Sequence, residues 1–173
     1  MLSFSKNEFV IVGFLVRHFS ARFTIRDVAS KLSISAPGAH AALKKLENNG
    51  MVVAEKLGSG LFYSVNFGSS LAEHFAAMTL LSGVSLDAIS GLEDYAEAAL
   101  YNGKTVVVIS SESEQVKNIV HEQKPNAVVV CLSADEFVGA LRDDASGVLK
   151  VLEEGNVLMG EGIILKAISE VRR

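Results

Sequence analysis

Apolar residues at the start of the chain recur at helical spacing. A helix is predicted from the capping box Ser5–Glu8 to about Phe19, and its apolar residues cover almost its whole circumference. Such a helix must be buried, either within its own domain or against a second chain. Two shorter helices are predicted next, one capped by Thr24 and one capped by Ser35 and ended by Gly50.

After Gly50 the pattern changes to the two-residue period of strands. Residues 51–55 and 61–67 are predicted strands, and the tight turn Gly58-Ser59-Gly60 joins them. The first part of the chain is therefore predicted to fold in the order helix, helix, turn, helix, hairpin.

Beyond Gly68, helices alternate with short valine-rich runs. A helix at 71–81 places Leu71, Phe75 and Met78 on one stripe, which could be a dimer seam or could pack against its own domain. Further helices are predicted at 86–100, 112–123, 134–142, 146–153 and the end of the chain, and strands at 104–109, 127–132 and 157–159. Short apolar runs between helices indicate buried strands of a small α/β sheet, so the fold class is α+β.

Composition narrows the compartment and the chemistry. The apolar fraction of 49% supports a packed core, yet the longest apolar runs, 106–109 and 127–132, are too short to cross a bilayer. No secretory signal is recognised at the N-terminus. The single cysteine, Cys131, excludes an intramolecular disulfide and a cysteine-built zinc site, and in an apolar strand it is expected to be a buried, inert thiol. We therefore expect a cytoplasmic protein with no membrane partner.

The charge is unevenly distributed along the chain. Residues 1–70 carry eight basic and four acidic side chains, a net charge of +4. Because the whole chain has a net charge of −4, residues 71–173 have a net charge of −8. A basic head on an acidic tail predicts that only the head contacts a polyanion. Chance segregation of solvated charges is the alternative.

A longer motif lies in the head, where residues 25–52 read IRDVASKLSISAPGAHAALKKLENNGMV. This stretch resembles the winged-helix regulators of the MarR and ArsR type. The resemblance implies a winged helix-turn-helix DNA-binding domain at 1–68, acting as a homodimer on a pseudo-palindromic site in double-stranded DNA. In such domains the second helix of the motif lies in the major groove while the first crosses the backbone.

The candidate DNA-binding residues follow from their positions on this motif. The candidates for contacting base edges are Ser35, Gly38 and His40. The candidates for neutralising phosphates are Lys44, Lys45, Arg22, Arg26, Lys31 and Lys56. Small residues on the recognition helix and a wing tip without arginine predict modest specificity dominated by phosphate contacts. The alternatives are a solvated basic face, an idle surface histidine at position 40, and a winged helix used for protein contacts.

The tail carries a second resemblance. The segments ADEFVGALR at 134–142 and VLKVLEEGNVLMG at 148–160 resemble the closing part of small prokaryotic nucleotidyltransferase-like domains. The whole chain is similar to archaeal regulators that join a winged helix to such a domain, here through a linker helix at 69–85 to a small α/β domain at 86–173. The catalytic version needs a Gly-Ser turn and an Asp-x-Asp metal pair, and this sequence has neither.

The segment that takes their place follows the strand ending at Ile109 and reads SSESE. Ser111 and Glu114 are predicted to form a capping box there rather than part of a metal site. The tail is therefore predicted to be degenerate and catalytically inactive, with no cofactor and no metal.

These patterns together predict a homodimeric, sequence-specific or semi-specific DNA-binding transcription regulator that is not an enzyme. Two alternatives stay open. One is a protein-interaction or antitoxin-like module, in which an unknown effector or partner protein engages the acidic tail. The other is a nucleotide-sensing nucleotidyltransferase homologue.

Overall fold

The computed structural model describes residues 3–82, 88–143 and 147–172. The chain divides into two compact units, Met1–Thr79 and Leu80–Arg173. Most of the helix predicted as a linker thus belongs to the N-terminal unit, and residues 83–85 of the predicted linker lie outside the described residues. None of the described helices is both long enough and apolar enough to cross a bilayer.

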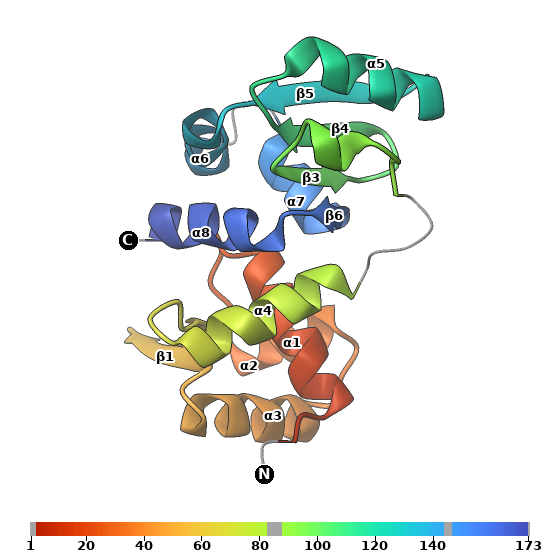
Figure 1. The fold of residues 1–173 in the computed structure, drawn as a ribbon. Helices are drawn as coiled ribbons and strands as arrows, with labels where there is room; N and C mark the ends of the chain where they lie inside the picture. The colour runs from red at the N-terminus through yellow and green to blue at the C-terminus, as the bar shows by residue number, and fades with distance from the viewer. Residues whose placement is uncertain (1–2, 83–87, 144–146, 173) are drawn as a thin grey trace. The chain divides into compact units, whose positions relative to one another are not determined.

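The N-terminal unit is a winged helix-turn-helix, as the sequence predicts (Figure 1). Its elements in chain order are α1 (Lys6–Arg17), α2 (Ile25–Lys31), α3 (Ala36–Asn48), β1 (Val52–Leu57), β2 (Gly60–Val65) and α4 (Ser70–Leu81).

Side-chain caps fix where the first three helices begin. Ser5 and Glu8 form the predicted capping box at α1, and Thr24 forms a second one with Asp27 at α2. The backbone N–H and the hydroxyl of Thr24 donate to the Asp27 carboxylate at 2.8 and 2.7 Å and hold its pKa below the ordinary value. At α3 the Ser35 hydroxyl accepts from the amide of Gly38 at 3.2 Å. These caps satisfy amides that a helix start would otherwise leave unpaired.

The core of the N-terminal unit forms where α1 and α3 pack together and against the hairpin. Its fully buried apolar side chains include Ile11, Val12 and Val16 of α1 and Leu43 and Leu46 of α3. Residues Val52 and Tyr63 extend this core into the hairpin. The almost wholly apolar α1 is therefore buried chiefly within its own unit.

The hairpin β1–β2 forms the wing. Its strands are antiparallel from Val52↔Val65 to Leu57↔Gly60, so two residues, Gly58 and Ser59, make the turn. Gly58 has a φ of +58°, which glycine adopts at no steric cost. The amide of Tyr63 donates to the carbonyl of Phe23 at 2.9 Å, which ties the wing to the segment before α2.

The C-terminal unit is a small α/β domain, again as predicted. Its elements are η1 (Leu92–Asp94), β3 (Ala98–Tyr101), β4 (Thr105–Ile109), α5 (Ser113–Gln123), β5 (Val128–Leu132), α6 (Ala134–Asp143), α7 (Val148–Glu154), β6 (Asn156–Met159) and α8 (Glu161–Arg172).

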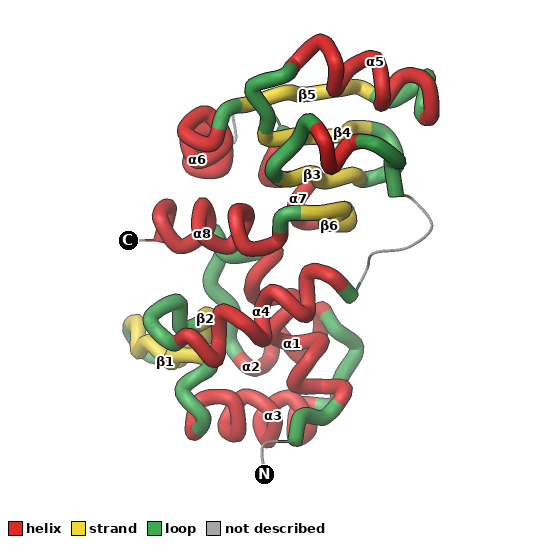
Figure 2. Tube along the Cα trace, viewed as in Figure 1, coloured by secondary structure: helices red, strands yellow, loops and turns green. Residues whose placement is uncertain are grey.

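The four strands of this unit lie in the order β5-β4-β3-β6 (Figure 2). The β4–β5 pair is parallel, connected through α5, and the other two pairs are antiparallel. Val116 and Val120 of α5 pack on one face of the sheet, in a cluster with Val106 and Val108 of β4. Helices α6, α7 and α8 contact the strands as well, and Phe137 of α6 is fully buried.

The prediction of a helix at 86–100 is wrong for the described residues 88–100. The chain there makes the single turn η1 and then the strand β3, while residues 86–87 lie outside the described residues. Gly91 has a φ of +82°, a left-handed conformation that a right-handed α-helix cannot contain. The Asn102-Gly103 turn then returns the chain into β4, with the Asn102 side-chain oxygen accepting from the amide of Thr105 at 2.9 Å. An Asn-Gly pair between apolar runs is a strong hairpin signal.

The capping box predicted at Ser111 and Glu114 is also wrong. Helix α5 has Glu112 at its N-cap with no side-chain cap of its own. The hydroxyl of Ser110 instead accepts from the amide of Glu112 at 2.8 Å and donates to the carbonyl of Tyr95. Ser110 takes the capping role in place of Ser111 because it is buried directly after β4, where its hydroxyl must find hydrogen-bond partners.

A capping box does form one strand later, at the start of α6. The amide and hydroxyl of Ser133 donate to the Glu136 carboxylate at 2.8 and 2.9 Å, and the Glu136 amide donates back at 3.3 Å. The two bonds from Ser133 hold the pKa of Glu136 below its ordinary value.

Truncating the inner face of α3 tests whether this helix is held by packing. Leu43 is fully buried, so Leu43→Ala is expected to lower the free energy of unfolding by about 2–5 kcal/mol. Hydrogen exchange measured by mass spectrometry should be faster along α3. The exposed Ala41→Ser is the control, with an effect of about 0.5 kcal/mol or less. Equal exchange in the two variants would contradict the assignment.

Candidate nucleic-acid interface

Helix α3 lies along the outer side of the N-terminal unit and divides cleanly into two faces (Figure 1). Its buried positions are Ala39, Ala42, Leu43 and Leu46. Its exposed positions are Ala36, Pro37, His40, Ala41, Lys44, Glu47 and Asn48. His40 and Lys44 are one helical turn apart and so project from the same side. The structure therefore brings together one candidate for base contact and one for phosphate contact.

The other two candidates for base contact build the start of the helix. The Ser35 hydroxyl accepts from the Gly38 amide, and a Cβ added at Gly38 would lie 2.9 Å from that hydroxyl and 3.4 Å from Ile34. Glycine at position 38 thus leaves room for the cap. Among the three candidates, His40 is the one whose side chain projects from the exposed face.

Lys45 and Lys44 are neighbours in sequence but have different surroundings. The Lys45 ammonium lies 3.1 Å from the Glu8 carboxylate and donates to the carbonyl of Ser3 at 2.6 Å. The Glu8 side chain is only 5% exposed, so this cation neutralises a buried charge. Lys45 therefore fastens α3 to the start of α1, whereas the Lys44 side chain is exposed.

Arg22 also has an anionic partner. Its guanidinium lies 3.0 Å from the carboxylate of Glu55 on β1, with both side chains more than half exposed. Exposed pairs of this kind contribute about 0–1 kcal/mol and exchange partners readily. The pair links the segment between α1 and α2 to the wing.

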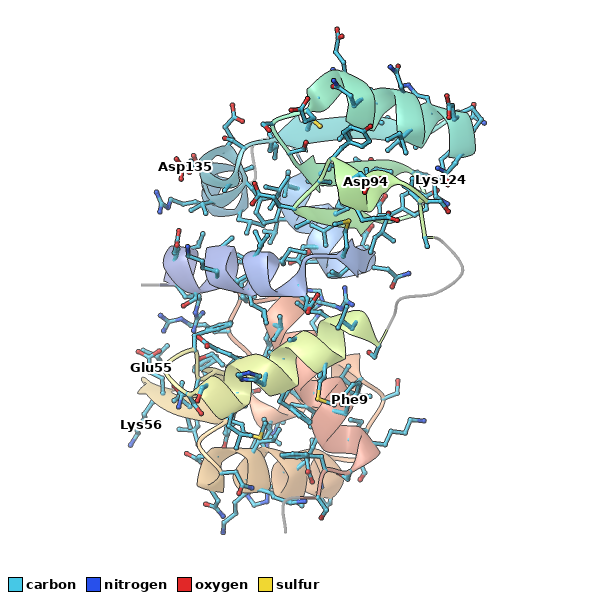
Figure 3. All side chains as sticks on the ribbon, in the orientation of Figure 1. Phe9, Glu55, Lys56, Asp94, Lys124 and Asp135 are labelled. Atoms are coloured by element: carbon cyan, nitrogen blue, oxygen red, sulfur yellow. The ribbon has the colours of Figure 1, made fainter. Side chains whose placement is uncertain are left out.

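Three further candidates lie on α2 and on the wing. Arg26 and Lys31 are exposed on α2, where Lys31 is one turn from Asp27 and helps to lower its pKa. Lys56 is exposed on β1 next to Glu55, and Figure 3 shows both side chains at the wing. Exposed candidates for phosphate contact therefore come from α2, α3, the wing and the segment between α1 and α2.

Sequence reasoning missed two features of this surface. The first is Glu8, which was assigned only to a cap and is also the buried partner of Lys45. The second is an apolar contribution from the wing, where Val53, Leu57 and Leu61 are 43, 37 and 43% exposed. The alternation along β1 could have indicated Val53 and Leu57, which share the face opposite the core.

The stripe predicted on α4 is divided between the inside and the outside of the unit. Phe75 is buried, with its ring centre 4.2 Å from that of Phe4 and 5.6 Å from that of Phe9. Leu71 and Met78 are exposed, at 38 and 59%. The centre of the stripe therefore packs within its own unit.

Metal ligands and the single thiol are the remaining candidate chemistries. No group of three or more His, Cys, Asp or Glu residues suited to a metal occurs among the described residues. Cys131, expected to be buried, is partly exposed. Burial raises the pKa of its thiol, against the opposing effects of the Ser113 hydroxyl and the Lys117 charge.

Comparison with known proteins gives only distant likenesses. No family model and no curated protein matches the chain. One solved structure is the homodimeric winged helix-turn-helix DNA-binding domain of a possible ArsR-family transcriptional regulator from Mycobacterium bovis. It is 19% identical, with a TM-score of 0.39, over 48% of this chain and 73% of that one. Another is the adhesin competence repressor AdcR of Streptococcus pyogenes, 18% identical with a TM-score of 0.38 over 84% of each chain. Similarity this low establishes neither family membership nor a shared function.

The adjacent lysines provide a matched pair for measuring stability. Lys45→Ala removes the partner of a buried carboxylate and is expected to lower the free energy of unfolding by about 1–3 kcal/mol. Lys44→Ala should change it by about 0.5 kcal/mol or less, because the Lys44 side chain is exposed. Thermal or urea unfolding followed by circular dichroism measures both. Equal losses in the two variants would show that Glu8 does not need Lys45.

Proposed function

We propose that the protein is a DNA-binding transcription regulator that inserts α3 into the major groove of double-stranded DNA. The observation that carries the proposal is the exposed face of α3, with His40 and Lys44 one turn apart on a winged helix whose residues 1–70 have a net charge of +4. A helix of this kind matches the width of the groove, and the positive charge favours the phosphates on either side.

The contacts divide between phosphates and bases. Lys44, Arg26, Lys31 and Lys56 neutralise phosphates from α3, α2 and the wing, and Arg22 joins them when its exposed pair with Glu55 opens. His40 approaches the base edges. Because alanine and glycine occupy much of the rest of α3, phosphate contacts supply most of the affinity and sequence preference is modest.

The C-terminal unit acts in this proposal as a non-catalytic part that oligomerises the chain or receives a signal. The segment after β4 lacks the Gly-Ser turn and the Asp-x-Asp pair that the nucleotidyltransferase resemblance requires for catalysis. A homodimer would present two α3 helices to two half-sites of a pseudo-palindromic sequence. The net charge of −8 beyond residue 70 keeps this unit away from DNA and suits a basic effector or partner.

Salt dependence tests the proposed phosphate contacts. Binding to random-sequence duplex should weaken steeply as salt rises, because each neutralised phosphate releases counterions. Lys44→Ala should weaken binding to all sequences alike and reduce the slope of log K against log salt by about 0.9. Lys166→Ala, at an exposed position on α8, is the control that should leave the slope unchanged. Failure to bind duplex DNA at low salt would reject the proposal and favour a winged helix that contacts protein.

Selection of bound sequences from a random pool tests the role of His40. His40→Ala is expected to relax the preference at one base position in each half-site and to leave the salt slope nearly unchanged, since a contact to a base edge neutralises no phosphate. Lys44→Ala should leave the selected sequence unaltered. If the two variants changed selection and salt dependence in the same way, the division between base and phosphate contacts would be wrong.

A further inference from the structure

Strand β5 is an open edge of the sheet in the C-terminal unit. It pairs with β4 on one side, and no described residue pairs with its other side. All five of its residues are at least partly exposed, and Val128 is 60% exposed, whereas four of the five residues of β4 are buried. Figure 2 shows β5 at the margin of the four strands.

The hydrogen bonds of β5 show which groups face outward. The Val128 amide donates to the carbonyl of Lys104 at 2.9 Å, and the Leu132 carbonyl accepts from Ser110 at 3.0 Å. Both groups of a residue in a parallel pair point to the same side, so Val128, Val130 and Leu132 bond to β4. The N–H and C=O groups of Val129 and Cys131 therefore point outward, away from β4.

The sequence of β5 lacks the features that usually protect an edge. VVVCL contains no charge, no proline and no glycine. The opposite edge, β6, has only four residues and a register shift against β3. An unprotected apolar edge with free backbone groups is a template for another strand. We therefore expect a partner on β5.

The charges at the two ends of β5 favour one kind of partner. Lys104 and Lys124 lie at its beginning, and Asp135 and Glu136 follow its end; Figure 3 shows Lys124 and Asp135 at opposite ends of the strand. A second β5 running antiparallel would bring each basic end against an acidic end. A parallel copy would set like charges side by side.

We propose that β5 pairs antiparallel with β5 of a second copy of this chain, joining two four-stranded sheets into one. The outward groups fix the register: Val129 of each chain exchanges both backbone bonds with Cys131 of the other, and the two Val130 residues face each other across the two-fold axis. In this register the basic beginning of each β5 lies beside the acidic residues that follow the end of the other β5.

This strand pairing shares one assumption with the proposed function, namely that the chain forms a homodimer. It assigns the dimer contact to the tail rather than to α4, because Phe75 of the α4 stripe is used within its own unit. DNA binding and strand pairing can therefore fail separately, because one is measured on duplex DNA and the other on the protein alone.

Disulfide trapping in the full-length chain tests the register. In a Cys131→Ser background, Val130→Cys places two thiols on the axis, where residues of such a pair have Cα atoms about 4.5 Å apart, within disulfide range. Val128→Cys is the matched control, since the register sets the two copies of residue 128 about 14 Å apart, four residues at roughly 3.4 Å each. The expected result is a covalent dimer of Val130→Cys on mild oxidation and none of Val128→Cys.

Charge reversal gives a second measurement that leaves the strand intact. Asp135→Lys should raise the dimer dissociation constant, seen by analytical ultracentrifugation, by about threefold to tenfold at low salt, with less effect at high salt. Glu93→Lys, at an exposed position on η1, should leave it unchanged. A monomeric protein, a dimer in which Val130→Cys does not cross-link, or equal cross-linking of both cysteine variants would overturn the proposal; the second result would direct attention to α4.

Discussion

The head is organised around one carboxylate that is removed from water. Glu8 caps α1 through Ser5 and accepts from Lys45 of α3, while its side chain is only 5% exposed. A buried carboxylate is costly unless it is paired and hydrogen-bonded, so these contacts must be made together. The apolar contacts of Leu43 and Leu46 hold α3 against the core, and the Glu8–Lys45 pair adds a directional restraint that packing alone does not provide.

This arrangement separates two lysines that a sequence motif treats as equal. The helical repeat turns Lys44 outward and Lys45 toward α1, and a partner on another element takes up the second charge. Arg22 is likewise neutralised by Glu55, but this ion pair lies at the surface, where it is weak and reversible. The net charge of a domain therefore overstates the cationic surface it offers to a ligand.

Local signals in the sequence predicted most of the fold. The caps at Ser5, Thr24 and Ser35 and the apolar spacing of α3 depend on residues within a few positions of each other, and both are confirmed. The partner of Lys45 could not be predicted in this way, because it lies on a different helix. The strand β3 was missed because its short apolar run, Ala98–Tyr101, fits the end of a buried helix as well as a strand. The nine candidate DNA-binding residues stay predictions, with their positions now known.

The hydroxyl of Ser110 bears on the nucleotide-sensing alternative for the tail. In a nucleotidyltransferase the chain after such a strand has to offer unused backbone donors to a triphosphate. Here the Glu112 amide already donates to Ser110, which in turn is held by the Tyr95 carbonyl, and the carboxylates of Glu112 and Glu114 lie close by. An incoming phosphate would have to displace an internal bond and approach two negative charges. The loop is thus closed on itself, which stabilises the junction between sheet and helix and disfavours a bound nucleotide.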